Sequence, residues 1–228
     1  MPRQVGPVRS RGSAVLTLVV GAKNYSSWSL RAWLALRVAG IPFDEVVIPL
    51  DRPETKAEIA RHSPSGRVPV LRDGDLRVWD SLAIIEYAAE RFPDSRLWPA
   101  DRIMRATARS VAAEMHAGFQ ALRAHLPMNL KRRPAARDLT AEVEADIGRV
   151  KEIWRTCRAR RAGPFLFGAF SGADAMYAPV VARFETYRVP VDPATRAYMD
   201  AVLGLAAFRE WREAALAEPW ASAKWDAV

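Results

Sequence analysis

The stretch that decides the fold is SGRVPVLRDGDLRVWDSLAIIEY, residues 65–87. It contains two short candidate strands, 67–71 and 75–78, and the Asp-Gly pair between them is typical of the tight turn of a β-hairpin. The residues after the second run have helical spacing of apolar side chains, and Ser81 is a candidate N-cap. The stretch therefore predicts a hairpin followed by a helix over residues 80–91.

Upstream of this stretch, the sequence alternates between strand and helix patterns. We expect a strand at about 15–20, a helix at about 27–39, a strand over 43–49 and a short helix over 54–61. With the hairpin and its helix the order becomes βαβαββα, and the first βαβ unit requires two parallel strands joined by a right-handed crossover. The sequence thus predicts an α+β domain over residues 14–94.

Downstream, the pattern is helical only. Apolar residues recur at three- and four-residue steps over 104–126 and again over 143–157, which indicates two long amphipathic helices. Three shorter helices are expected at about 174–186, 194–204 and 206–217. The segment 92–99, with two prolines, is typical of a linker. We therefore expect an all-helical domain over residues 101–228.

Composition and charge exclude several classes of protein. Of the 228 residues 50% are apolar and 26% charged, which are ordinary globular values. The net charge of +8 includes three arginines in residues 1–13, which we expect to be a disordered basic tail. Aromatic residues do not interleave with the second basic cluster, over 123–137, so charge alone is a weak argument for nucleic-acid binding. No apolar run approaches the ~20 residues of a membrane span.

The chain lacks the usual signatures of several chemistries. A single cysteine excludes a disulfide framework, and Cys157 lies on the apolar stripe of a predicted helix, which favours a structural role. No pair of histidines has metal-ligand spacing, and the G-x-S-x-G, G-x-G-x-x-G, P-loop and C-x-x-C patterns are absent. The apolar run 14–22 follows basic residues and could be read as a secretory signal core, but the βαβ unit requires it as a strand.

Three local features follow one another in a characteristic order along the chain. The segment NYSSWS, residues 24–29, joins the first strand to its helix, Val68-Pro69 stands at the head of the third strand, and Asp80-Ser81 opens a helix. Each alone is an ordinary cap or turn device. In this order on a βαβαββα unit, they resemble the cytosolic glutathione S-transferases.

The resemblance implies a fold, a co-substrate and a binding site. It implies a thioredoxin-like domain followed by a helical domain, a homodimer, a cytoplasmic location, and glutathione as co-substrate with no metal. The residues that would bind glutathione are Arg67, Val68, Pro69, Asp80 and Ser81. A cis peptide bond between Val68 and Pro69 would turn the strand edge toward the bound tripeptide.

The serine-rich helix start is similar to the classes that use serine rather than tyrosine, and closest to the zeta class. Trp28 stands at the cysteine position of the S-S-C-S pattern of that class. In the helical half, the segment from Ser171 to Asp174 resembles the capping box of a late core helix of the family. The resemblance leaves three alternatives to conjugation: glutathione-dependent isomerisation of the maleylacetoacetate type, a peroxidase reaction, and binding of glutathione or a protein without turnover.

The chemistry expected at the serines is thiol activation. A thiol with a pKa near 8.5 is mostly protonated at neutral pH, and lowering this pKa by two units needs about 2.7 kcal/mol of preference for the anion. A hydrogen bond to a charged group supplies about 1.5–3 kcal/mol, and a helix N-terminus adds roughly 0.3–1 kcal/mol. A serine hydroxyl is therefore sufficient as a donor. Ser26 is the first candidate and Ser27 the second.

The second substrate would be a hydrophobic electrophile held between the first helix and the first long helix of the C-terminal half. The candidates for this site are Trp28, Met115, His116 and Phe119. Core packing explains the last three equally well, because they belong to an apolar stripe or adjoin it.

Overall fold

The computed structural model describes residues 15–159 and 162–227, so the predicted basic tail lies outside the described residues. A four-stranded sheet forms the first domain, in the order β2-β1-β3-β4. Its strands are β1 (Leu16–Gly21), β2 (Phe43–Ile48), β3 (Val70–Asp73) and β4 (Leu76–Trp79). Strand β1 pairs with β2 in parallel, and β3 runs antiparallel to both β1 and β4. The parallel βαβ unit and the hairpin are both confirmed.

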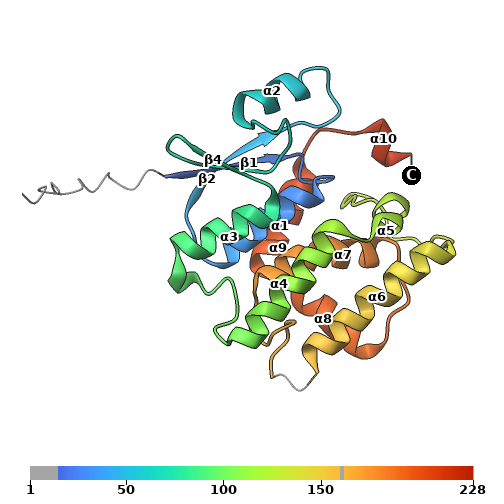
Figure 1. The fold of residues 1–228 in the computed structure, drawn as a ribbon. Helices are drawn as coiled ribbons and strands as arrows, with labels where there is room; N and C mark the ends of the chain where they lie inside the picture. The colour runs from blue at the N-terminus through green and yellow to red at the C-terminus, as the bar shows by residue number, and fades with distance from the viewer. Residues whose placement is uncertain (1–14, 160–161, 228) are drawn as a thin grey trace, which may run out of the picture.

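Helices cover both faces of this sheet. Helix α2 (Thr55–His62) lies on one face, whereas α1 (Ser27–Val38) and α3 (Ser81–Arg91) lie on the other, toward the helical domain (Figure 1). Leu18 and Val20 of β1 join the large core on the α1 side, and Val19 joins a small core with Ile59 of α2. Alternate residues of a strand point to opposite faces, so β1 is buried from both sides.

The second domain is helical, as expected. A 3-10 turn, η1 (Pro93–Ser95), precedes it, and its helices are α4 (Arg102–Ala117), α5 (Gln120–His125), α6 (Ala141–Arg158), α7 (Gly172–Thr186), α8 (Pro193–Leu203), α9 (Ala206–Ala217) and α10 (Ala223–Asp226). Helix α7 is buried along nearly its whole length and lies at the centre, next to α1 and α4 (Figure 1). One continuous core joins the two domains through this contact. Cys157 is part of that core, as its place on the apolar stripe predicted.

The capping box predicted at the start of α7 is present. Ser171 Oγ donates to Asp174 Oδ2 over 3.0 Å, and the same carboxylate accepts the Ser171 backbone N–H over 2.9 Å. The Asp174 side chain is fully buried, and this burial raises its pKa to about 6 although four hydrogen bonds favour the charged form.

The long helix predicted over 104–126 is wrong. Helix α4 ends at Ala117, Gly118 is its C-cap, and α5 begins at Gln120 after Phe119 adopts a left-handed backbone with φ of 62°. Apolar residues still recur at helical steps across the break because both short helices bury them in the same core. The apolar periodicity therefore continues across a point at which the helix itself is interrupted.

Two further boundaries differ from the prediction. Strand β3 begins at Val70 rather than at Arg67, after the cis Val68–Pro69 bond, which was expected and is confirmed. Asp80, not Ser81, caps α3, since its Oδ1 accepts the Leu82 N–H over 2.9 Å. Ser81 is instead the first residue of the helix, so its hydroxyl is not used as a cap.

Candidate active site

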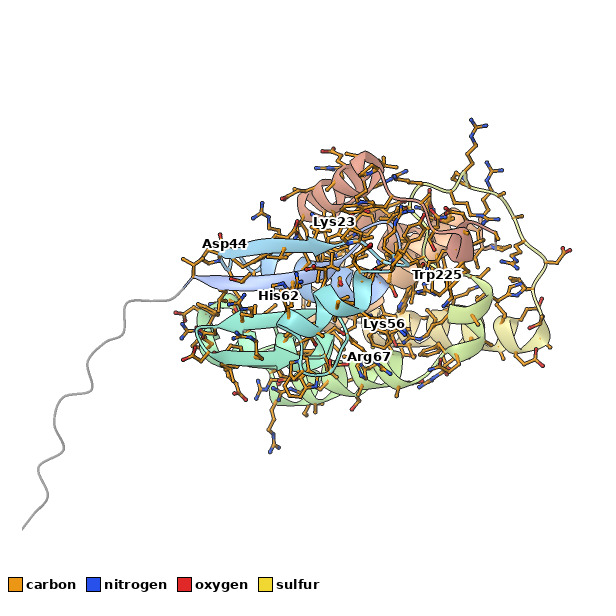
Figure 2. The ribbon with its side chains drawn as sticks, turned by 90° about the horizontal axis from the view of Figure 1, so that it is seen from above. Lys23, Asp44, Lys56, His62, Arg67 and Trp225 are labelled. Carbon is orange, nitrogen blue, oxygen red and sulfur yellow. The ribbon has the colours of Figure 1, made fainter. Side chains whose placement is uncertain are left out.

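Two adjoining cavities lie where the two domains meet. The larger has a volume of about 760 Å³ and the smaller about 520 Å³, and Trp28, Arg67 and Val68 line both. Arg67 and Trp225 both line the larger cavity. Figure 2, which views the molecule from the side of α2, shows them toward the same end of the sheet.

The cavities bring together most of the candidate residues. Of these candidates, Ser26 and Ser27 line the larger cavity, and Pro69, Asp80, Ser81 and His116 line the smaller one, beside the three shared residues named above. Met115 and Phe119 line neither cavity. Both are buried in the hydrophobic core: Met115 lies on the inward apolar stripe of α4, and Phe119 lies in the break between α4 and α5.

The two serines at the start of α1 differ in their hydrogen bonds. Ser26 is the N-cap: its Oγ accepts the Ser29 N–H over 3.4 Å and donates to Ser29 Oγ over 2.7 Å. Ser27 Oγ has no hydrogen-bond partner in the part of the chain that the structure describes, and Ser27 lines the larger cavity. The hydroxyl that is available to a ligand without rearrangement is therefore that of Ser27.

The segment before β3 offers a free backbone edge. Val68 lies directly before the cis bond and lines both cavities. Within the described residues, its N–H and C=O make no hydrogen bond. An extended peptide can pair with such an edge through its own backbone groups.

The start of α3 can accept an anion. Ser81 is fully buried and its Oγ lacks a hydrogen-bond partner among the described residues, although it lines the smaller cavity. A buried unpaired hydroxyl is costly, and a helix N-terminus presents N–H groups to negative charge. Asp80, with φ of 75°, caps the helix with one carboxylate oxygen and lies 3.3 Å from His116 Nε2 with the other. This corner can hold a carboxylate on Ser81 and an ammonium group near Asp80.

The C-terminal segment closes one side of the larger cavity. Asp226 accepts hydrogen bonds from the Tyr25 hydroxyl over 2.9 Å and from Asn129 Nδ2 over 2.8 Å. These bonds hold α10 so that Lys224 and Trp225 line the cavity. The sequence pattern did not indicate this helix, because four residues carry too little periodicity.

Sequence reasoning also missed two arginines of the lining. Arg123 of α5 and Arg183 of α7 line the larger cavity. The Cζ atom of Arg123 lies 4.9 Å from the centre of the Trp28 ring. Arg31 of α1 lies 4.4 Å from the same centre. A detectable signal exists: Arg31 and Arg183 are charged residues within otherwise buried helical segments.

Within residues 15–159 and 162–227, no group of three or more His, Cys, Asp and Glu side chains is placed to hold a metal ion. The same residues form no helix that is both long and apolar enough to cross a membrane.

The geometry defines a class: a thioredoxin-like domain that lies against an all-helical domain, with the free Val68 backbone edge and the starts of α1 and α3 lining the adjoining cavities. The family model for the N-terminal domain of glutathione S-transferases matches residues 25–91, and the model for their C-terminal domain matches residues 105–214. The chain belongs to the glutathione S-transferase family.

Curated relatives include isomerases and transferases. The chain is 30% identical over 190 residues to maleylacetoacetate isomerase of Rattus norvegicus, an alignment that covers 81% of this chain and 87% of that protein. It is 36% identical over 98 residues to a probable maleylacetoacetate isomerase of Caenorhabditis elegans, covering 42% of this chain and 45% of that protein. For this relative and two others, the chain spans about half the length of the protein it matches or less.

Solved structures show the same fold. A zeta-class maleyl pyruvate isomerase, described as a bacterial glutathione S-transferase, superposes with a TM-score of 0.69 at 24% identity, covering 90% of this chain and 100% of that one. A glutathione transferase homologue from Burkholderia with bound glutathione gives a TM-score of 0.68 at 22% identity, covering 88% and 98%.

Proposed function

We propose that this protein is a glutathione transferase that joins the glutathione thiolate to an electrophilic small molecule. One observation carries the proposal: adjoining cavities bring together the start of α1, the free Val68 edge and the start of α3. In a bound γ-glutamyl tripeptide, the start of α1 would meet the thiol, the Val68 edge would meet the peptide backbone, and the start of α3 would meet the γ-glutamyl residue.

The smaller cavity suits the γ-glutamyl end. The unpartnered Ser81 hydroxyl and the N-terminus of α3 would bind its carboxylate, and the Asp80 carboxylate would face its ammonium group. The Val68 backbone would pair with the cysteinyl residue. Arg67 is exposed at the mouth of both cavities and would meet the glycyl carboxylate.

Glutathione affinity is expected to fall about tenfold to a hundredfold in Ser81→Ala, because the hydroxyl would donate a charge-assisted hydrogen bond worth about 1.5–3 kcal/mol. The free energy of unfolding is expected to change little, since Asp80 provides the cap of α3. Isothermal titration with glutathione and urea unfolding measure the two effects. Ser110→Ala, on the exposed face of α4, is the matched control. Unchanged affinity in folded Ser81→Ala would contradict the assignment.

At the start of α1, a serine hydroxyl would donate to the sulfur and favour the thiolate. Serine is a donor here and not a base, because its own proton is too weakly acidic. We place Ser27 before Ser26, since the Ser26 hydroxyl is already bonded to Ser29. Trp28 lines both cavities and would face the electrophile, and its ring lies edge to face with that of His116, with ring centres 5.1 Å apart.

A second candidate is glutathione-dependent isomerisation, which the curated relatives favour by name. In that reaction, the thiolate adds to a double bond, rotation follows, and the thiolate leaves again. Trp28 at the position of the class cysteine distinguishes this chain from the S-S-C-S pattern. The same activated thiol would serve both reactions.

The test is a turnover assay with glutathione and 1-chloro-2,4-dinitrobenzene. The carbon–sulfur bond forms, the carbon–chlorine bond breaks, chloride leaves, and the thiol proton passes to the buffer. Conjugation above the uncatalysed rate is the expected result. A second arm follows the cis-trans isomerisation of maleylacetoacetate with catalytic glutathione. Glutathione binding without turnover in either arm would leave a binding protein and overturn the proposal.

We further propose that the protein works as a homodimer in the cytoplasm. Leu76 and Trp79 on the edge strand β4 and Ile103 on α4 are exposed large apolar side chains. Such residues suit an interface between two copies. Light scattering on the purified protein should give twice the chain mass of 25.4 kDa, and a single-chain mass would contradict this.

A further inference from the structure

The loop between β1 and α1, residues 22–26, leads into the two serines and is bound by side chains of the helical domain. The Lys23 C=O accepts a hydrogen bond from Trp211 Nε1 over 3.1 Å, and Asn24 Nδ2 donates to Asn129 Oδ1 over 3.1 Å. Lys23 and Asn24 have exposed fractions of only 7% and 0%, and buried polar groups need partners within the fold. For this loop, several of these partners come from the second domain.

Glu218 binds the backbone of this loop. Its Oε1 accepts the Lys23 N–H over 2.6 Å, and its Oε2 accepts the Asn24 N–H over 3.2 Å. Hydrogen bonds to an ionised carboxylate are stronger than those between neutral groups, and two consecutive N–H groups on one carboxylate fix the orientation of the peptide unit between them. Lys131 Nζ donates to the backbone oxygen of Glu218 and ties it in turn to the segment after α5.

The place of Glu218 follows from the end of α9. Glu218 is the C-cap of this helix, and because Pro219 disfavours a helical residue before it, Glu218 is extended with ψ of 134°. Helix α9 packs in turn on α1, where the rings of Trp33 and Trp211 lie 5.3 Å apart. Burial raises the pKa of the Glu218 carboxyl, and the two N–H donors act against this effect by favouring its charged form.

Glu218 lines neither cavity, so its contacts indicate positioning rather than contact with a substrate. Inside the loop, the chain forms a compact turn: the N–H groups of Tyr25 and Ser26 both donate to the Ala22 oxygen, over 3.1 Å and 2.9 Å. The Ser27 N–H donates to the Tyr25 oxygen over 2.9 Å. A displacement of the loop is therefore passed on to both serines.

We propose that Glu218 is a positioning residue for the serine donor: its carboxylate holds the loop 22–26 so that the Ser27 hydroxyl reaches the sulfur of bound glutathione. This inference rests on the proposed function and deepens it, because it makes activation of the thiol depend on the helical domain. Precise placement matters for such a donor, since a misplacement of about 1 Å can cost about a hundredfold in rate.

The test is the pH dependence of Glu218→Ala. The pKa of bound glutathione, followed by the thiolate absorbance, should rise by about one unit, and for a wild-type pKa of about 6.5 this lowers kcat at pH 7 by about threefold. The difference in kcat should vanish at about pH 9, where both complexes hold the thiolate, whereas a general loss of structure would lower kcat at every pH. Affinity for S-methylglutathione, which has no ionisable thiol, should be unchanged, since the start of α3 and the Val68 edge would bind the rest of the tripeptide.

Two further variants accompany this one. Glu218→Gln keeps the size of the side chain and one acceptor oxygen, so it should fold and show a smaller rise in the pKa of the bound thiol. Glu213→Ala is the matched control, because it removes an exposed carboxylate from the same helix, α9, and it should leave the pKa unchanged. The sign of the shift is informative: loss of a nearby negative charge by itself would favour the thiolate and lower the pKa, and a lowered pKa in Glu218→Ala would overturn the inference.

A double-mutant cycle shows whether Glu218 acts through the serine. In the Ser27→Ala background, Glu218→Ala should cause no further rise in the pKa of the bound thiol, because the donor that Glu218 positions is already absent. Equal shifts in the two backgrounds, or a wild-type pKa and kcat in folded Glu218→Ala, would overturn the inference and leave the transferase proposal intact. A wild-type protein with neither thiolate absorbance nor turnover would overturn both.

Discussion

The pKa of bound glutathione is expected to rise by about one to two units in Ser27→Ala, because a hydrogen bond to the thiolate worth about 1.5–3 kcal/mol is lost and each unit equals 1.36 kcal/mol. For a wild-type pKa of about 6.5, turnover at pH 7 should fall by about threefold to 25-fold, in proportion to the thiolate fraction. The absorbance of the thiolate in the complex, followed against pH, measures the pKa directly.

The Ser26→Ala variant is the one to compare with Ser27→Ala. It removes the N-cap of α1, so the free energy of unfolding should fall by about 1 kcal/mol. A smaller change in the thiol pKa is expected, since the Ser26 hydroxyl donates to Ser29. A shift confined to Ser26→Ala would assign the role to Ser26. No shift in either variant would mean that backbone N–H groups, Asn24 or Tyr25 supply the donor.

The free energy of unfolding is expected to fall by about 4 kcal/mol in Asp174→Ala, at the upper end of single substitutions, because a buried hydrogen-bond network is lost. The Asp174 carboxylate accepts from the Leu166 N–H, from the N–H and hydroxyl of Ser171, and from the Tyr198 hydroxyl, over 2.9–3.2 Å. Without it, four buried donors at the centre of the helical domain lose their acceptor. Urea unfolding measures the effect.

Asp192→Ala is the control for this prediction. Asp192 also caps a helix, α8, through the N–H and hydroxyl of Thr195, but at the surface. Its loss should cost about 1 kcal/mol, the usual value of an exposed cap. Equal losses in the two variants would show that burial of the network adds nothing, and would contradict the central role assigned to Asp174.

The sequence by itself determined the architecture. The continuous, mostly β-branched run over 15–20 predicts a buried strand, and the Asp-Gly turn predicts the hairpin of β3 and β4. The spacing of apolar residues over 143–157 predicts α6. Each of these features depends on residues that lie close together in the chain. Local rules of secondary structure are therefore sufficient to predict them.

Part of the candidate site could also be predicted from the local sequence. Ser26 and Ser27, the Val68–Pro69 bond and Asp80-Ser81 stand at the ends of elements whose order fixes where they meet. The sequence placed them together because strand and helix ends of one βαβαββα unit converge at one edge of its sheet.

Only the tertiary structure decided the rest. Apolar periodicity does not distinguish one long helix from two short ones that share a core, so the break at Gly118 and Phe119 and the burial of Met115 could not be predicted. Arg31, Arg123 and Arg183 lie on three different helices, α1, α5 and α7. Their placement depends on how these helices pack, as α1 does against α7, and such a long-range contact cannot be predicted from a local sequence pattern.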